Sequence, residues 1–283
     1  MTTFDRRLTP ARPDLAAARL EGTVPAARYV APRLMQVASP LADLRRAPSP
    51  EASLDTQALC GELVDVYEVE EGWAGGQLRR DGYVGYLAAA DLTARVEATT
   101  HRVVTRATFL YPAPDIKTPR LDALPLGAQV RVEATNGDFA RTARGFLFAA
   151  HLDARAPHAR DFVAVAETMI GTPYLWGGKS PAGLDCSGLV QLALAEAGLD
   201  APRDTDMQEK ALGEAVAFDD ALTGLARGDL VYWKGHVGIM RDADALLHAN
   251  GFHMLTTSEN LRAAARRIAG AGAGAITSIK RLL

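Results

Sequence analysis

Residues 171–191 read GTPYLWGGKSPAGLDCSGLVQ, a loop rich in glycine and proline that runs directly into an apolar segment. Gly198 interrupts that segment, so we expect a helix from about residue 186 to residue 197. Cys186 then occupies the helix N-terminus, where unpaired backbone N–H groups and the helix dipole favour negative charge. This position predicts a lowered thiol pKa and a cysteine nucleophile.

The segments that follow predict an antiparallel meander. Short apolar runs occupy residues 229–233, 236–240 and 245–249 and are separated by turn residues. His236 begins the second run and His248 lies in the third, and side chains on adjacent strands come within about 5 Å. We therefore expect His236 to act as the general base and His248 to orient it.

A cysteine and two histidines also permit other interpretations. A cysteine on an apolar helix is often a buried packing residue, as we expect for Cys60 on its strand. One thiolate and two imidazoles are, in addition, a chemically reasonable zinc ligand set. The residue types of Cys186, His236 and His248 leave these alternatives open.

Upstream of this region the chain changes character. Asp161 is positioned to cap a short helix that carries Phe162, Val165, Ala166 and Met169 and that Gly171 ends. From about residue 30 to residue 155, apolar and polar residues alternate in short runs broken by turn residues, which predicts small antiparallel sheets. This part contains an internal repeat: GYLAAADL at 85–92 is echoed by GFLFAAHL at 145–152.

Composition limits the classes of protein that are possible. The 283 residues are enough for about two domains, and 48% apolar with 23% charged residues is typical of a globular protein. A net charge of −3 argues against nucleic-acid binding. Because no apolar run has the length of a signal peptide or a membrane span, we expect no membrane insertion and a cytoplasmic location. Two distant cysteines do not indicate a disulfide framework.

Several blocks together resemble the NlpC/P60 family of cysteine peptidases. They are residues 171–191, PRDTDMQ at 202–208, RGDLVYWKGHVGIM at 227–240 and LLHAN at 246–250. The resemblance implies a papain-like fold, cleavage of peptides from bacterial peptidoglycan, and no metal or cofactor in the mechanism. It also implies that Cys186 is the nucleophile, His236 the general base and acid, and His248 the third member of the triad.

The repeated β segments resemble tandem bacterial SH3-like barrels, although the first has Tyr86 where a Trp is common. With the peptidase blocks, they resemble γ-D-glutamyl-L-diamino acid endopeptidases, which cut short stem peptides with a free N-terminal L-Ala and release L-Ala-γ-D-Glu. The resemblance implies substrate contacts at Glu62, Tyr83, Thr205 and Tyr174, and we also expect contacts from Asp185 and Ser187 because they flank Cys186.

The expected architecture is α+β, with two small SH3-like β-barrels followed by a papain-like domain. We expect an N-terminal arm at 1–29, barrels at 30–96 and 97–156, and the peptidase domain at 157–283. The alternatives are a protein that binds wall peptides beside an inactive peptidase domain, and an NlpC/P60-type amidase or acyltransferase acting on another amide. The choice between L-Lys and diaminopimelate in the substrate, the role of the arm and the oligomeric state stay open.

Overall fold

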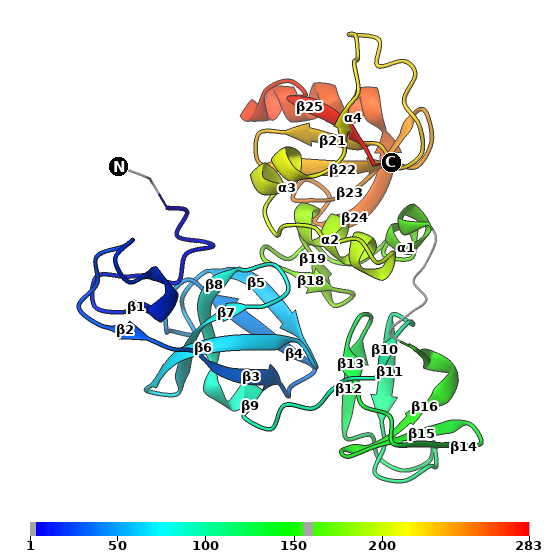
Figure 1. The fold of residues 1–283 in the computed structure, drawn as a ribbon. Helices are drawn as coiled ribbons and strands as arrows, with labels where there is room; N and C mark the ends of the chain where they lie inside the picture. The colour runs from blue at the N-terminus through cyan, green and yellow to red at the C-terminus, as the bar shows by residue number, and fades with distance from the viewer. Residues whose placement is uncertain (1–3, 155–160, 283) are drawn as a thin grey trace. The chain divides into compact units, whose positions relative to one another are not determined.

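The chain divides into two units, Met1–Ala156 and Pro157–Leu283, in the computed structural model, which describes residues 4–154 and 161–282. Figure 1 labels the helices and strands of each unit. In the described residues no helix is long and apolar enough to cross a membrane.

The C-terminal unit is built on one antiparallel six-stranded sheet with the order β20-β25-β21-β22-β23-β24. Its strands are β20 (Glu214–Ala215), β21 (Leu230–Trp233), β22 (His236–Met240), β23 (Ala245–Asn250), β24 (Leu255–Asn260) and β25 (Ser278–Arg281). The meander predicted from the three apolar runs is confirmed as β21, β22 and β23. A short hairpin, β18 (Lys179–Ser180) with β19 (Gly183–Leu184), precedes the sheet in the chain.

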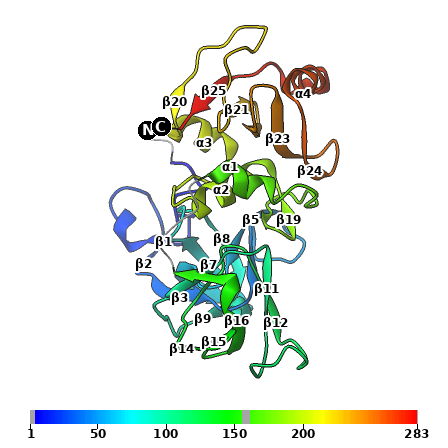
Figure 2. The ribbon, with the colours of Figure 1, turned by 90° about the vertical axis from the view of Figure 1, so that its right-hand side faces the viewer.

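Helices cover both faces of this sheet (Figures 1 and 2). The helices are α1 (Phe162–Glu167), α2 (Cys186–Glu196), α3 (Thr205–Ala211) and α4 (Leu261–Ile268), which continues into the π-helical turn Ala269–Ala273. The apolar side of α4 packs on one face of the sheet, in a core shared with Trp233 and Met240. On the other side α2 packs against α1, β22 and β23.

The sequence of α2 explains its central place. Ten of its eleven residues are buried, and apart from Gln191 and Glu196 these buried residues are apolar or small. It ends before Gly198, which has a φ of +77°. The predicted cap at Asp161 is also confirmed, since its Oδ1 accepts from the backbone N–H of Val163 at 2.9 Å. The α-helix that it begins is shorter than predicted, and tighter turns fill the interval to Gly171.

The first part of the N-terminal unit is a seven-stranded sheet with the order β5-β4-β8-β7-β6-β3-β9. Its strands are β3 (Arg33–Val37), β4 (Leu41–Arg45), β5 (Leu54–Leu59), β6 (Leu63–Glu70), β7 (Trp73–Leu78), β8 (Val84–Ala88) and β9 (Leu92–Thr93). Alternating buried residues from these strands, among them Leu44, Val64 and Leu87, form one apolar core.

The second part consists of three small antiparallel sheets, β13-β10-β17, β11-β12 and β14-β15-β16. The strands are β10 (His101–Val103), β11 (Ala107–Leu110), β12 (Asp122–Pro125), β13 (Gln129–Val130), β14 (Ala134–Asn136), β15 (Phe139–Thr142), β16 (Gly145–Phe148) and β17 (Leu152–Ala154). They enclose a separate core that includes Val103, Leu124 and Leu147 and also Cys60 from the first part.

The repeat in the sequence is repeated in the backbone. In both copies a strand leads through a 3₁₀ turn, Ala89–Asp91 or Ala149–His151, into a short closing strand. Gly61 and Gly127 have φ values of +85° and +83°. Each donates its N–H to the carbonyl of a valine, Val37 or Val103, at 2.9 Å. The same local fold therefore occurs twice.

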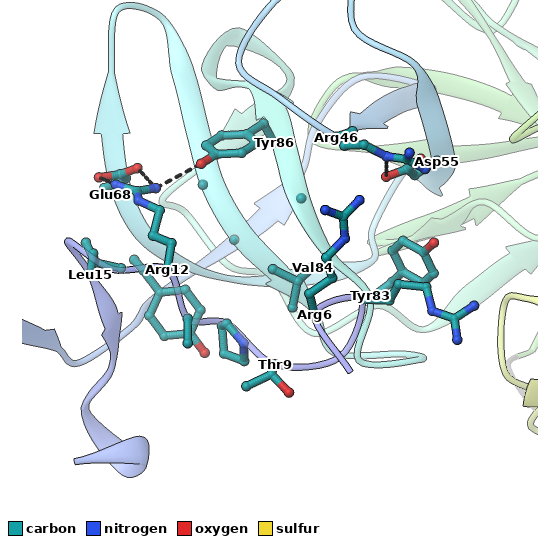
Figure 3. Close-up of a pocket in the computed structure, with 17 residues that line it drawn as sticks. Arg6, Thr9, Arg12, Leu15, Arg46, Asp55, Glu68, Tyr83, Val84 and Tyr86 are labelled. Atoms are coloured by element: carbon teal, nitrogen blue, oxygen red, sulfur yellow. Dashed lines mark hydrogen bonds and ion pairs between the residues drawn. The ribbon is translucent and has the colours of Figure 1, made fainter. Parts of the chain in front are cut away.

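Part of the N-terminal arm folds over the first sheet. Its elements are β1 (Ala16–Ala17), the 3₁₀ turn Ala18–Leu20 and β2 (Tyr29–Val30), which pairs in parallel with β1. Arg12 forms an ion pair with Glu68 and donates to the hydroxyl of Tyr86 at 2.9 Å, as Figure 3 shows. Gly75 lies in register between Glu68 and Tyr86, and a Cβ there would lie 3.3 Å from a side-chain atom of each.

The arm and strands β6 to β8 enclose a pocket of about 250 Å³ (Figure 3). Two carboxylates in its wall are paired with arginines, Glu68 with Arg12 and Asp55 with Arg46. The pair of Arg12 with Glu68 joins the arm to the sheet and gives the arm a structural role that the sequence left open, whereas the pair of Arg46 with Asp55 does not involve the arm.

Gly61→Ala should destabilise the N-terminal unit by clearly more than Gly72→Ala. Both glycines have φ near +80°, which costs an L-residue about 1–2 kcal/mol. A Cβ at Gly61 would in addition lie 2.3 Å from the carbonyl oxygen of Gln129, whereas none lies within 4 Å at Gly72. Denaturant unfolding measures the two losses, and equal losses would contradict a close contact at Gly61.

Candidate active site

The loop before α2 is held by backbone packed directly on backbone. A Cβ at Gly188 would lie 2.1 Å from the carbonyl oxygen of Gly178, and one at Gly178 would lie 2.4 Å from that of Gly183. Only glycine permits these approaches. The glycines of residues 171–191 therefore set the path that delivers Cys186 to the start of α2.

Asp185 is the N-cap of α2 and joins the loop to the helix. Its Oδ1 accepts from the backbone N–H of Gly188 at 2.7 Å, and its Oδ2 accepts from that of Gly177 at 2.9 Å. Satisfying orphan N–H groups at a helix start is the usual role of an aspartate here. Asp185 thus fixes the backbone on both sides of Cys186.

Arg203, which the sequence analysis did not single out, binds the same carboxylate. Its two terminal nitrogens donate to the two oxygens of Asp185 at 3.0 and 2.6 Å, and one also donates to the Ser187 hydroxyl at 2.8 Å. The Arg203 side chain is 1% exposed. A two-pronged buried pair of this kind is strong and directional. The only signal for it was its place in PRDTDMQ, two residues before Thr205.

Cys186 begins α2, as predicted, but the pKa of its thiol is raised instead of lowered. The residue is 7% exposed, and burial, followed by the charge of Asp185, raises the pKa of the thiol to about 11. The expected lowering by the helix N-terminus is wrong, because the loss of solvation outweighs the dipole in this buried position. The sulfur lies 3.8 Å from the hydroxyl oxygen of Thr205 and accepts a hydrogen bond from the backbone of Val237.

His236 and His248 are brought together as the meander predicts. His236 Nε2 lies 2.8 Å from His248 Nδ1. Gly238 lies on β22 without room for a side chain, since a Cβ there would lie 2.6 Å from Cδ1 of Leu246 and 3.3 Å from the Cβ of His248. Val237, whose backbone bonds the sulfur of Cys186, directly follows His236. Among the described residues no hydrogen bond joins the sulfur to an imidazole, and such bonds often tighten only with substrate bound.

Both imidazoles are held in the neutral form. Burial, followed by the charge of Arg267, lowers the pKa of His236 to about 4. The pKa of His248, which is fully buried, is lowered further by burial and by the neighbouring His236. The resting pair is therefore a neutral thiol and a neutral imidazole.

Glu259 extends the chain of polar groups, and the sequence did not reveal it. His248 Nε2 lies 2.8 Å from Glu259 Oε1, and Arg267 on α4 donates to the same oxygen. Arg267 also lies over the ring of Phe252, 4.2 Å from its centroid. His248, Glu259 and Arg267 come from β23, β24 and α4, so they meet only through the pairing of the two strands and the packing of the helix.

The other predicted contact residues lie in two groups. Thr205, Ser187 and Tyr174 belong to the C-terminal unit and surround Cys186, and burial together with the charges of Cys186 and Asp185 raises the pKa of Tyr174. Glu62 and Tyr83 belong to the N-terminal unit. Both are buried, and Glu62 accepts from the backbone N–H of Leu59 at 3.1 Å.

The zinc interpretation has no counterpart in the geometry. Within residues 4–154 and 161–282 no group of three or more His, Cys, Asp or Glu side chains is arranged to hold a metal ion. His248, one of the three residues weighed as ligands, has its two ring nitrogens directed at His236 and Glu259. This is the arrangement of an oriented base.

Two families of known proteins match separate parts of the chain. Residues 171–268 match the NlpC/P60 family, and residues 44–92 match the bacterial dipeptidyl-peptidase Sh3 domain. A crystal structure of an NlpC/P60 family protein from Bacillus cereus has the same fold, with a TM-score of 0.72 at 20% identity. The comparison covers 88% of this chain and 99% of that one.

Two relatives are named γ-D-glutamyl-L-lysine dipeptidyl-peptidase. The protein from Bacillus subtilis is 31% identical over 239 residues, which are 74% of this chain and 77% of that protein. The protein from Bacillus cereus is 30% identical over 209 residues, 65% of this chain, and the match spans only 61% of the length of that protein. With its matching domains and this similarity over most of its length, the chain belongs to the NlpC/P60 family of cysteine peptidases.

Proposed function

We propose that the protein hydrolyses the γ-D-glutamyl–L-diamino acid bond of short peptidoglycan stem peptides with a free N-terminal L-Ala, and that it releases L-Ala-γ-D-Glu. The observation that carries the proposal is the imidazole pair of His236 and His248 at 2.8 Å, beside a thiol bonded to the backbone of Val237. The names of the two Bacillus relatives support the bond and the substrate class. Such a reaction belongs to the recycling of wall peptides.

In the proposed mechanism Cys186 is the nucleophile and His236 the base. His236 takes the thiol proton as the sulfur attacks the γ-carbonyl carbon of D-Glu, which gives a tetrahedral oxyanion. When this collapses, the C–N bond breaks, His236 gives its proton to the leaving amino group, and a thioester remains. Water, deprotonated by His236, then attacks the thioester and returns the thiol. His248 keeps the His236 ring oriented through both halves.

Tyr174 and the start of α2 are the proposed donors to the oxyanion. Because its pKa is raised, the Tyr174 phenol keeps its proton and stays a hydrogen-bond donor throughout the neutral range. The backbone N–H of Gly188 already donates to Asp185. We therefore propose that the N–H of Cys186, at the same helix start, donates to the oxyanion. Donors fixed before the reaction stabilise developing charge without reorganising.

We also propose that the N-terminal unit contains two SH3-like modules and that the first helps to recognise the substrate amine. The match of residues 44–92 and the repeated glycine and 3₁₀ turn support this. Glu62 and Tyr83 are the proposed contacts of the first module, together with Asp185, Ser187 and Thr205 near the nucleophile. A buried ammonium group needs such carboxylate and hydroxyl partners.

Cys186→Ala should abolish hydrolysis of L-Ala-γ-D-Glu-L-Lys and of the diaminopimelate peptide, with a loss of about 10⁴-fold or more in kcat, because no nucleophile remains. Cys60→Ala is the matched control, since Cys60 is an equally buried thiol in the other unit, and it should stay active. Mass spectrometry of the products measures both. Binding without cleavage by the unmutated protein would favour a binding protein, and a product other than L-Ala-γ-D-Glu would favour an amidase or transferase.

Alkylation of Cys186 by iodoacetamide should rise steeply with pH. The thiolate is the reacting form, and below a pKa of about 11 its fraction grows about tenfold per pH unit. In Cys60→Ala protein, the rate followed by mass spectrometry should therefore climb through the range from about pH 6 to about pH 9. A rate that is flat between about pH 5 and about pH 8 would instead indicate a preformed thiolate–imidazolium pair.

The free peptide should be cleaved about 10- to 150-fold better than its N-acetylated form, since acetylation removes a charge-assisted hydrogen bond worth about 1.5–3 kcal/mol. Glu62→Gln keeps an oxygen for the Leu59 N–H but loses the charge, so it should reduce the ratio of kcat/KM for the free peptide to that for the acetylated peptide. Asp65→Asn, which removes a carboxylate paired with Arg79 in the same module, should leave the ratio unchanged. Equal kcat/KM values for the two peptides with unmutated protein would rule out recognition of the amine.

A further inference from the structure

The hydrogen bonds behind the nucleophile cross three adjacent strands. His236 on β22, His248 on β23 and Glu259 on β24 are joined by two contacts of 2.8 Å each. A histidine nitrogen either donates or accepts, depending on which of its two ring nitrogens carries the hydrogen. Donors and acceptors could therefore alternate along these hydrogen bonds in either order. Only one order leaves His236 with an unprotonated ring nitrogen that can act as the base.

Arg267 determines the order of donors and acceptors at the Glu259 end of this series of hydrogen bonds. It donates to Oε1 of Glu259, the same oxygen that faces Nε2 of His248. A guanidinium has donors only, so this oxygen accepts. Because two groups share one accepting oxygen, Nε2 of His248 must carry the hydrogen of that bond.

The position of the hydrogen on His248 in turn determines its position on His236. His248 is neutral and has one N–H, at Nε2, so its Nδ1 is an acceptor. Nε2 of His236 must therefore be the donor in the contact between the two rings. A neutral His236 with its hydrogen on Nε2 has a free lone pair on Nδ1.

We propose that Glu259, held by Arg267, is a positioning residue that sets the tautomers of both histidines and thereby leaves Nδ1 of His236 as the atom that accepts the Cys186 proton. With the opposite order, His236 would carry its hydrogen on Nδ1 and could not act as a base there. The assignment of the tautomers stands on the hydrogen bonds together with the neutral state of the buried His248, whereas its catalytic consequence rests on the proposed function.

The contribution of Glu259 is its accepting oxygen rather than its charge. The ion pair with Arg267 balances the carboxylate locally. A glutamine at this position would turn its carbonyl oxygen toward Arg267, because its amide N–H groups would meet the guanidinium donors. The same oxygen would then accept from His248 and preserve the tautomers without a charge.

Three variants separate these contributions. Glu259→Ala removes the acceptor, and Glu259→Gln keeps it without the charge. Asp244→Asn is the control, since Asp244 pairs with Arg262 on α4 at 2.6 Å in the same unit and is not bonded to a histidine in the described residues. All are compared with the unmutated full chain, by steady-state kinetics on L-Ala-γ-D-Glu-L-Lys and by ¹⁵N NMR of histidine-labelled protein at neutral pH, with His236 and His248 assigned by substitution of the other histidines.

In the unmutated protein the spectra should show hydrogen on Nε2 and a lone pair on Nδ1 for both His236 and His248. Glu259→Ala should mix the tautomers and lower kcat about 10²-fold with KM within about threefold, which is the scale of general-base catalysis. Glu259→Gln should keep the tautomers and stay within about tenfold of the original kcat. Asp244→Asn should change neither measurement.

Two results would overturn the proposal. One is hydrogen on Nδ1 of His236 or His248 in the unmutated protein, a measurement that does not depend on any variant folding. The other is a Glu259→Gln variant as impaired as Glu259→Ala, which would show that the charge matters and the accepting oxygen does not. If the unmutated protein cleaves neither peptide, the proposed function fails, while the NMR measurement still decides the tautomers.

Discussion

The C-terminal unit depends on one buried ion pair, that of Asp185 and Arg203. The carboxylate caps α2, holds the loop through Gly177 and receives two bonds from the guanidinium. A single side chain therefore links the loop, the helix that carries Cys186 and the segment before α3. Removing either partner of such a pair costs about 3–5 kcal/mol, because a charge is left buried without compensation. Because the pair lies at the start of α2, its loss would first change the position of the Cys186 sulfur.

Local patterns were sufficient to predict the elements that carry chemistry. The helix beginning at Cys186, the meander and the neighbouring positions of His236 and His248 follow from periodicity and turn residues, and all are present in the structure. Arg203 and Glu259 were not predictable in this way, because their partners lie 18 and 11 residues away and meet them only through tertiary packing. The direction of the Cys186 pKa shift was missed for a related reason: the helix position is local, whereas burial depends on the whole fold.

The N-terminal unit shows the same division. Its repeat was visible in the sequence because Gly61 and Gly127 adopt the same backbone conformation, with positive φ, at equivalent positions. The docking of the arm was not visible, since Arg12 reaches Glu68 across 56 residues. A register shift between Val66 and Glu68 also breaks the alternation of β6, so a pattern of period two could not assign Glu68 to a face of the sheet.

The neutral state of Cys186 has a consequence for the durability of the protein. Peroxides attack thiolates, and oxidation beyond the sulfenic acid is not reversed by ordinary thiols. A sulfur that is 7% exposed, with a pKa of about 11, spends almost no time in the sensitive form in the resting protein. The burial that keeps the Cys186 thiol from ionising therefore also protects it from oxidation.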